Sequence, residues 1–350
     1  QLQLSHAIRA SCQWASSVGV QTRFILTGNR ERRSFVQQIK LDVIMDWGIH
    51  LPHLGRQVDR KTLMGFAKEA ERLGCHSGWV SDHVCWPAEI ASKYPYTDDG
   101  SFQPSPDMGW LDPISTLTFV AACTEKLRLG TTVLILPYRM PVQTAKQIAS
   151  LDVMSDGRAI LGVGVGWMAE EAAVLGMPWD KRGKRSDEQL EIFRRLFTDA
   201  EPEFDGEYYS FPKVGFEPKP VQKPLPIWVG GSTPVAFRRV AKFGHAFHAA
   251  FQPRQEIVDA WSAIQRECEA IGRDPAELSL SLRIYLDPAQ AMQKSKSIGG
   301  SKDEMLETIA ACREIGISHL LLDPVARGGV PGRLDALRAF MEDIAPAVGG

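Results

Sequence analysis

The pair Asp82-His83 is the strongest candidate for acid–base chemistry in this sequence. It follows residues 76–81, a short stretch with the composition of a buried strand. A histidine whose pKa lies near neutrality can move a proton at working pH, and a neighbouring carboxylate can orient its ring. The alternative is a buried histidine that only satisfies backbone carbonyl groups at the strand end. Spacing alone leaves both interpretations open.

Two further histidine pairs, His50 with His53 and His245 with His248, have a spacing that raises the question of a metal site. Residues i and i+3 of a strand point to opposite faces, and no carboxylate shares either spacing. We therefore expect loop or core histidines and no bound metal ion.

Two glycine-rich segments are candidate binding sites. Gly162, Gly164 and Gly166 alternate along an apolar run and would let a ligand approach the backbone, although they do not form the dinucleotide fingerprint GxGxxG. The segment Gly230-Gly231-Ser232 lies just before a predicted helix that begins near Pro234. Free N–H groups at a helix N-terminus could bind an anion there, and the alternative is a tight turn.

Eight strands, each followed by a helix, must position these residues. The long connections follow strands, and the proline-rich stretch of residues 200–225 is an excursion from the repeat. This pattern predicts an α/β fold, a TIM (β/α)8 barrel with elaborated βα loops, whose active site lies at the C-terminal strand ends. A doubly wound sheet is the rival, but it does not need eight regular units. The predicted strands are residues 47–51, 76–81, 127–136, 159–165, 226–229, 246–251, 278–285 and 319–322.

Several helix starts carry capping signals. Asp59 precedes a helix with apolar residues at i, i+3, i+4 and i+7 spacing, and Pro113 stands in the first turn of another. Ser186 is predicted to cap a helix that runs to Phe197, with Glu188 close to the capping-box position.

Composition excludes several classes of protein. The net charge of −2 gives no electrostatic case for nucleic acid or an anionic membrane, and no apolar run is long enough to span a bilayer. Six cysteines without CxxC pairing indicate reduced thiols and a cytoplasmic location, and no GxSxG elbow supports nucleophilic hydrolysis. We expect a small-molecule ligand.

Residues 1–44 differ from the rest of the chain. They contain six Arg and Lys residues but two acids, and they sustain neither a helix nor a strand period. A targeting peptide is one interpretation. The one that we favour is a poorly ordered extension before a single domain, residues 45–350.

Taken in order, the motifs of residues 45–348 resemble the luciferase-like flavin and deazaflavin oxidoreductase superfamily of TIM barrels, and most of all its branch that uses coenzyme F420. The matching motifs are residues 79–83 (WVSDH), 129–134 (LGTTVL), 151–158 (LDVMSDGR), 161–167 (LGVGVGW), 182–188 (RGKRSDE), 206–209 (GEYY) and 218–231 (PKPVQKPLPIWVGG).

The resemblance implies a role for each matching residue. Asp82 would hydrogen-bond the deazaflavin ring, and His83 would face its reactive carbon as the catalytic residue. The peptide Thr132–Val133 would be cis, in a bulge that supports the ring. Gly164 and Gly166 would let the ring or its side chain lie against the strand. The phosphodiester would bind at Gly230, Gly231 and Ser232.

Two departures bear on the substrate. Trp167 stands where the sugar-phosphate dehydrogenase of this group has a proton-donating glutamate, so that substrate is not expected. Residues 244–247 are Gly-His-Ala-Phe where relatives have Gly-Asp-Gly followed by Trp or Phe. An aromatic, apolar substrate pocket is expected from Trp86, Trp110, Trp167 and Trp179.

The predicted function is therefore hydride transfer between coenzyme F420 and an unidentified apolar small molecule, by a homodimer as the resemblance implies. A monooxygenase that uses FMN with a flavin reductase partner is the nearest alternative. A metal-dependent TIM-barrel hydrolase and a non-catalytic cofactor carrier are alternatives from other classes.

Overall fold

The computed structural model describes residues 45–348 except 57, 98, 103, 105 and 106. The expectation for residues 1–44 lies outside this range. In the described part of the chain, no helix is long and apolar enough to cross a bilayer.

Eight parallel strands of the described residues form a closed barrel, as the sequence predicts. Each strand pairs with the next around the ring, and β10 pairs with both β9 and β12, which closes it. The order is β1 (Asp46–His50), β2 (Ser77–Val80), β3 (Arg128–Thr131), β5 (Ala159–Gly164), β8 (Ile227–Val229), β9 (Ala246–Ala250), β10 (Ser279–Leu286) and β12 (Ile317–Pro324). Two short strands extend this set, β4 (Leu134–Ile135) on β5 and β11 (Ser297–Ile298) on β10.

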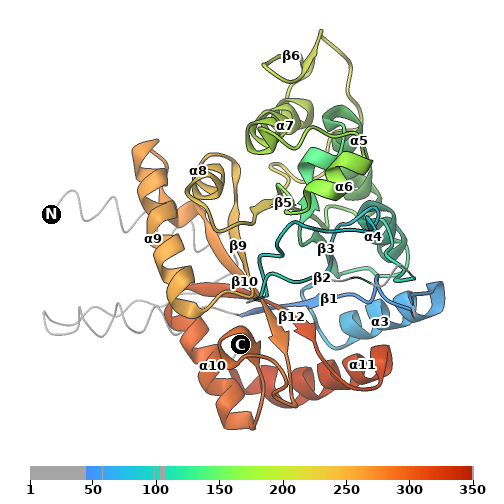
Figure 1. The fold of residues 1–350 in the computed structure, drawn as a ribbon, viewed down its shortest axis with the longest axis vertical. Coiled ribbons are helices and arrows are strands. Elements are labelled where there is room, and N and C mark those ends of the chain that lie inside the picture. Colours follow the sequence, from blue (N-terminus) through green and yellow to red (C-terminus); the bar gives the residue numbers. More distant parts are fainter. Residues whose placement is uncertain (1–44, 57, 98, 103, 105–106, 349–350) are drawn as a thin grey trace, which may run out of the picture. The chain divides into compact units, whose positions relative to one another are not determined.

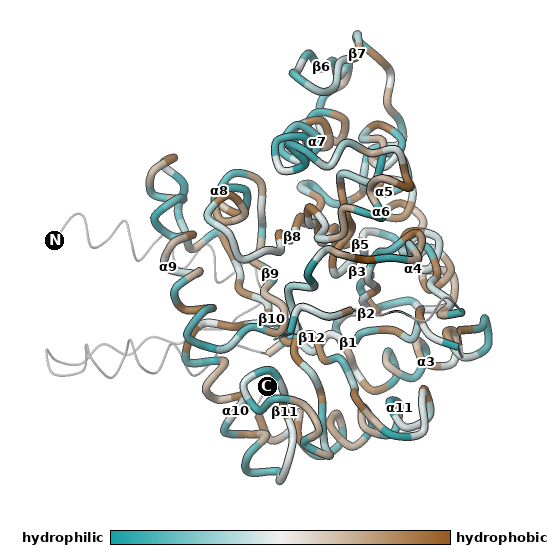
Figure 2. The backbone as a smooth tube through the Cα atoms, viewed as in Figure 1, coloured by the Kyte–Doolittle hydropathy of each residue, from teal (hydrophilic) through white to brown (hydrophobic). Residues whose placement is uncertain are grey.

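Helices cover the outside of the barrel (Figure 1). The Asp59 side chain accepts a hydrogen bond from the Thr62 N–H at 2.8 Å, which confirms the predicted cap of the first of them. Figure 2 shows both hydrophilic and hydrophobic residues along these outer helices, as expected when one face packs on a barrel. They are α3 (Arg60–Arg72), α4 (Pro113–Ala121), α5 (Pro141–Met154), α6 (Ala169–Val174), α7 (Arg182–Thr198), α8 (Pro234–Phe243), α9 (Arg254–Ala270), α10 (Lys302–Glu314) and α11 (Gly329–Ala339).

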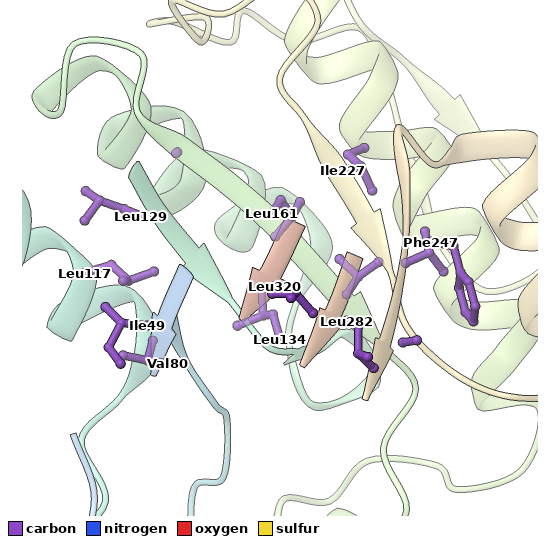
Figure 3. Packing of buried hydrophobic residues seen from close by; sticks show 14 of the residues in the cluster. Ile49, Val80, Leu117, Leu129, Leu134, Leu161, Ile227, Phe247, Leu282 and Leu320 are labelled. Carbon is purple, nitrogen blue, oxygen red and sulfur yellow. The ribbon is translucent and has the colours of Figure 1, made fainter. Parts of the chain in front are cut away.

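The main core lies between the strands and these helices. Ile49 of β1 and Val80 of β2 face Leu117 of α4 in Figure 3, and all three side chains are almost fully buried. Each such side chain contributes about 1.5–3 kcal/mol relative to an exposed one. This layer fixes the strands and so places the residues at their ends.

A chain of polar side chains crosses the barrel interior. Ser77 Oγ lies 2.9 Å from His319 Nε2, and His319 Nδ1 lies 2.9 Å from Ser281 Oγ. The same hydroxyl lies 2.9 Å from His248 Nδ1, whose Nε2 lies 2.9 Å from Thr132 Oγ1. Burial lowers the pKa of His248 to about 3 and that of His319 well below its ordinary value, so both rings are neutral.

Helix α7 begins earlier than predicted. Lys181 has φ 59°, a left-handed turn residue, and the helix starts at Arg182. Ser186 is therefore inside the helix, where its hydroxyl donates to the Arg182 carbonyl at 2.9 Å, and the predicted cap at Ser186 is wrong.

Glu188 does not take part in a capping box. Its side chain binds the backbone of a β-hairpin. Strands β6 (Phe204–Asp205) and β7 (Ser210–Phe211) pair antiparallel within the predicted excursion. The Glu188 carboxylate accepts the N–H groups of residues 207–209 at 2.7–3.1 Å, which fixes the turn between them. The hairpin lies beyond α7 in Figure 1.

Candidate active site

A cavity of about 1100 Å³ lies at the C-terminal ends of the barrel strands, where the active site of a TIM barrel is expected. Loops from several strands converge on it, because all eight strands are parallel. Eleven of the residues predicted to be catalytic, to bind the cofactor or to form the substrate pocket line this cavity: Asp82, His83, Trp110, Thr132, Val133, Gly164, Gly166, Trp167, Gly230, Gly231 and Ser232.

His83 is held by a buried carboxylate that sequence reasoning missed. Glu171 of α6 has a side chain with no exposed surface, and its Oε2 lies 2.6 Å from His83 Nδ1. The other oxygen accepts the N–H groups of Val84 at 2.6 Å and Cys85 at 3.2 Å. With Nδ1 engaged, Nε2 is the ring nitrogen left for a ligand in the cavity. The arrangement has the geometry of an oriented general acid–base.

Asp82 does not orient His83, although the two are adjacent. Its fully buried carboxylate binds Arg139, whose Nη2 lies 2.6 Å from Oδ1, and it accepts the Ile135 N–H at 2.9 Å. Burial raises the pKa of Asp82, and the Arg139 guanidinium opposes this effect. Both carboxylate oxygens already have donors, and a hydrogen bond from Asp82 to a cofactor ring stays a prediction.

The peptide Thr132–Val133 is cis, as the resemblance led us to expect. Val133 also explains two of the glycines. A Cβ added at Gly164 would lie 2.5 Å from Val133 Cγ2, and one at Gly230 would lie 3.2 Å from Cγ1. The side chain of Val133 therefore explains why both positions are glycine. Direct contact of these glycines with a cofactor stays a prediction.

Aromatic side chains surround the His83 ring. Its centroid lies 4.7 Å from that of Trp86, 5.0 Å from Trp110 and 6.0 Å from Trp167. Trp110 and Trp167 line the cavity, whereas Trp86 is not among its lining residues.

Trp179 lies elsewhere. The Arg182 guanidinium stacks 3.9 Å above its ring, and the ring packs on a small cluster around Tyr138. Trp179 is not among the residues that line the cavity, and a substrate pocket formed by the four tryptophans stays a prediction. Apolar content in a loop does not tell on which side a ring will pack.

A model of the family described as luciferase-like monooxygenase matches residues 44–298. The chain belongs to the luciferase-like monooxygenase family. It is therefore an enzyme, and the TIM barrel with a C-terminal cavity is the fold expected of it.

Relatives of this luciferase-like enzyme include two informative proteins. An uncharacterised protein of Mycobacterium tuberculosis is 33% identical over 282 residues, which are 80% of this chain and 91% of that protein. The F420-dependent glucose-6-phosphate dehydrogenase of Amycolatopsis mediterranei is 30% identical over 236 residues, 66% of each chain.

Solved structures support the fold. An F420-dependent secondary alcohol dehydrogenase, solved with an F420–acetone adduct, superposes with a TM-score of 0.72 at 19% identity, over 88% of this chain and all of that one. The monooxygenase RslO1 from Streptomyces bottropensis superposes with a TM-score of 0.70 at 23% identity, over 87% of this chain and 99% of that one.

The cavity of this luciferase-like enzyme is cationic, although the whole chain has a net charge of −2. Seven basic residues line it against three acidic ones, so an anionic ligand is favoured. The basic residues are Lys93, Lys181, Arg182, Arg239, Arg283, Lys296 and Arg333, and the acidic ones are Asp82, Glu256 and Asp323.

The four histidines considered for metal binding have other partners. His53 Nδ1 lies 3.1 Å from the Leu51 carbonyl, and His245 Nδ1 accepts the Ile227 N–H at 3.0 Å. His50 Nε2 lies 3.3 Å from Ser81 Oγ, and His248 belongs to the interior chain. Across the ranges that the structure describes, no three His, Cys, Asp or Glu side chains are grouped to hold a metal ion. The metal-dependent hydrolase is not favoured.

Proposed function

We propose that this luciferase-like enzyme transfers a hydride between coenzyme F420 and a small organic substrate with an apolar body. The observation that carries the proposal is the His83–Glu171 pair, which faces a large cationic cavity at the C-terminal strand ends. When bound, the deazaflavin accepts or donates the hydride. The protein supplies binding, orientation and the accompanying proton.

The residues after β8 fit the anionic tail of such a cofactor. Gly231 has φ 115°, and a Cβ there would lie 2.9 Å from the Ala236 side chain. The turn leads into α8, whose N-cap is Thr233, so backbone N–H groups at a helix N-terminus are available for a phosphodiester. Lys181 and Arg182 line the same cavity.

His83 is the group that we assign to proton transfer. When the His83 ring takes up a proton at Nε2 it becomes positively charged, and the Glu171 carboxylate stabilises this charge. The His83 ring can then return the proton to an oxygen or carbon of the substrate. A positioned acid–base of this kind contributes about 10²–10⁴ in rate. Trp110 and Trp167 exclude water on the same side and provide apolar surface for the body of the substrate.

The relative from Amycolatopsis mediterranei is an F420-dependent dehydrogenase, which supports F420 as the cofactor. FMN is the rival cofactor, because its phosphate would suit the same turn at Gly230-Gly231-Ser232. Titration of the full chain with oxidised F420, reduced F420 and FMN decides between them. We expect F420 to bind and to quench tryptophan fluorescence, and FMN to bind far more weakly. Tight FMN binding without F420 binding would overturn the assignment.

A substrate screen with the loaded enzyme then tests His83. We expect His83→Ala to bind F420 with wild-type affinity and to turn over at least about 100-fold more slowly. His76→Ala, a histidine outside the cavity, is the matched control. The expected homodimer and the reductase partner are separate proposals, which light scattering and co-purification test.

A further inference from the structure

A second group of polar side chains, three of them charged, lies across the cavity from the proposed phosphodiester turn. It consists of His50 at the end of β1, Arg283 on β10, Asp323 on β12 and Arg333 on α11, and all four line the cavity. In the order β8-β9-β10-β12-β1 these strands lie on the side of the ring away from the Gly230 turn. Of these strands, β1 pairs with β2, and His83 lies in the loop that follows β2.

This charge cluster contains more positive than negative charge. Arg283 Nε lies 3.1 Å from Asp323 Oδ2, and Arg333 Nη2 lies 3.7 Å from Oδ1 of the same carboxylate. In the described part of the chain, Asp323 is the acid within ion-pair distance of either arginine. Burial lowers the pKa of His50 well below its ordinary value, and Arg283 lowers it further, so the ring is neutral. Two guanidinium groups therefore share one carboxylate.

Buried polar atoms without a hydrogen-bond partner are also present. Arg333 Nη2 donates to the His50 carbonyl at 3.0 Å, but Arg333 Nε is buried without a partner among the described residues, as is His50 Nδ1. Tyr94 and Tyr96 line the same cavity, and burial raises the pKa of both, so that their hydroxyls remain protonated donors. A buried unpaired charge and an unsatisfied donor each cost free energy, which an anionic ligand would recover.

We propose that the substrate carries a carboxylate that binds at Arg333. This inference rests on the proposed function, since it places the substrate in the hydride-transfer site. A row of neighbouring rings leads from the cluster to the hydride-transfer site. The His50 and His53 ring centroids lie 5.1 Å apart. The Trp110 ring lies 5.6 Å from His53 and 5.0 Å from His83. The rings of His53 and Trp110 thus lie between the cluster and the catalytic histidine, so a substrate whose carboxylate binds at the cluster can direct its apolar body toward His83.

Phenylacetate and phenylacetamide test this subsite, because they have nearly the same shape and differ in charge. Their binding to the full chain, with and without F420, is measured by calorimetry. We expect phenylacetate to bind at least about ten-fold more tightly, the order of a charge-assisted hydrogen bond. Arg333→Gln should abolish this preference, and Arg333→Lys should keep part of it.

Arg338→Gln is the matched control, because Arg338 is on the same helix but pairs with Glu69 outside the cavity. It should bind phenylacetate as the wild type does. Equal binding of acid and amide to the wild type, or an unchanged preference in Arg333→Gln, would overturn the carboxylate subsite.

Asp323→Asn provides a second test that does not require the Arg333→Gln variant to fold. Removing the counter-charge should tighten phenylacetate binding and leave phenylacetamide unchanged, and weaker acid binding would contradict the proposal. Failure of F420 to bind, with the acid preference intact, would overturn the proposed function and leave the anion subsite standing. F420 binding without a preference for the acid would overturn the anion subsite and leave the proposed function standing.

Discussion

Replacing Glu171 by Gln removes the charge beside His83 with little change in shape. One oxygen of Glu171 accepts two backbone N–H groups, from Val84 and Cys85, so the side-chain amide will keep its oxygen there. Its NH₂ group then faces His83 Nδ1, where the carboxylate oxygen stood at 2.6 Å. The ring must therefore carry its proton on Nε2, which is the wrong tautomer for accepting one there.

The size of the effect follows from the bond that is lost. A hydrogen bond to a charged group contributes about 1.5–3 kcal/mol. If this stabilisation is needed only when the imidazole ring is charged, the rate falls about 10- to 150-fold, at 1.36 kcal/mol for each factor of ten. Cofactor affinity and KM should change little, because Glu171 is not among the residues that line the cavity.

The assay is single-turnover conversion of bound F420, together with nitrogen NMR of the His83 ring to identify its tautomer. Glu170→Gln is the matched control, because the Glu170 carboxylate accepts the N–H groups of Ala91 and Ser92 at 3.0 Å, whereas the His83 ring pairs with Glu171. In the double variant with His83→Ala, the Glu171 change should have no further effect on rate. A wild-type rate in Glu171→Gln, or additive losses in the double variant, would refute the coupling.

Three further changes test how the site is supported. Asp82→Asn removes the buried carboxylate that pairs with the partly buried Arg139 guanidinium and should cost about 3–5 kcal/mol of unfolding free energy, measured by urea denaturation; an unchanged midpoint would contradict this. Gly164→Ala places a methyl group 2.5 Å from Val133 and should cost about 1–3 kcal/mol, and adding Val133→Ala should restore the Tm; no rescue would mean that another contact is responsible. The pKa of His248 is 6.5 in the unfolded chain and about 3 in the folded chain, so between these pH values only the unfolded chain binds the proton. The free energy of unfolding therefore falls as pH falls through that window, by up to about 1.4 kcal/mol per pH unit. His248→Gln should make the measured slope of unfolding free energy against pH shallower by that amount, and equal slopes would show that His248 does not contribute.

The barrel could be predicted from sequence because its signals are local. Strand and helix periods alternate eight times, and the helix starts marked by Asp59 and Pro113 depend on neighbouring residues. Parallel strands then bring their C-terminal ends together, so residues as distant as His83 and Gly230 could be assigned to one cavity from their positions in the repeat.

The partners within the cavity could not be predicted in the same way. Glu171 reaches His83 across 88 positions and Arg139 reaches Asp82 across 57, from a loop helix and a turn whose packing no local pattern encodes. The two adjacent acids Glu170 and Glu171, soon after the glycine run, were the available signal, but nothing in the sequence says which of them points inward. The packing of Trp179 on the cluster around Tyr138, away from the cavity lining, likewise has no local signal in the sequence.

The polar chain inside the barrel has a direction. The indole N–H of Trp79 can only donate, so Ser77 Oγ accepts it at 2.8 Å. When the Ser77 proton goes to His319 at 2.9 Å, and not to His76 at 3.3 Å, the direction of the chain is set at this end. Each following bond then runs the same way through Ser281 and His248. The last N–H points at Thr132 Oγ1, which leaves the Thr132 hydroxyl proton for the cavity. In this direction Thr132 meets a bound molecule as a donor, and Trp79→Phe would remove the N–H that keeps Ser77 from accepting through the same lone pair.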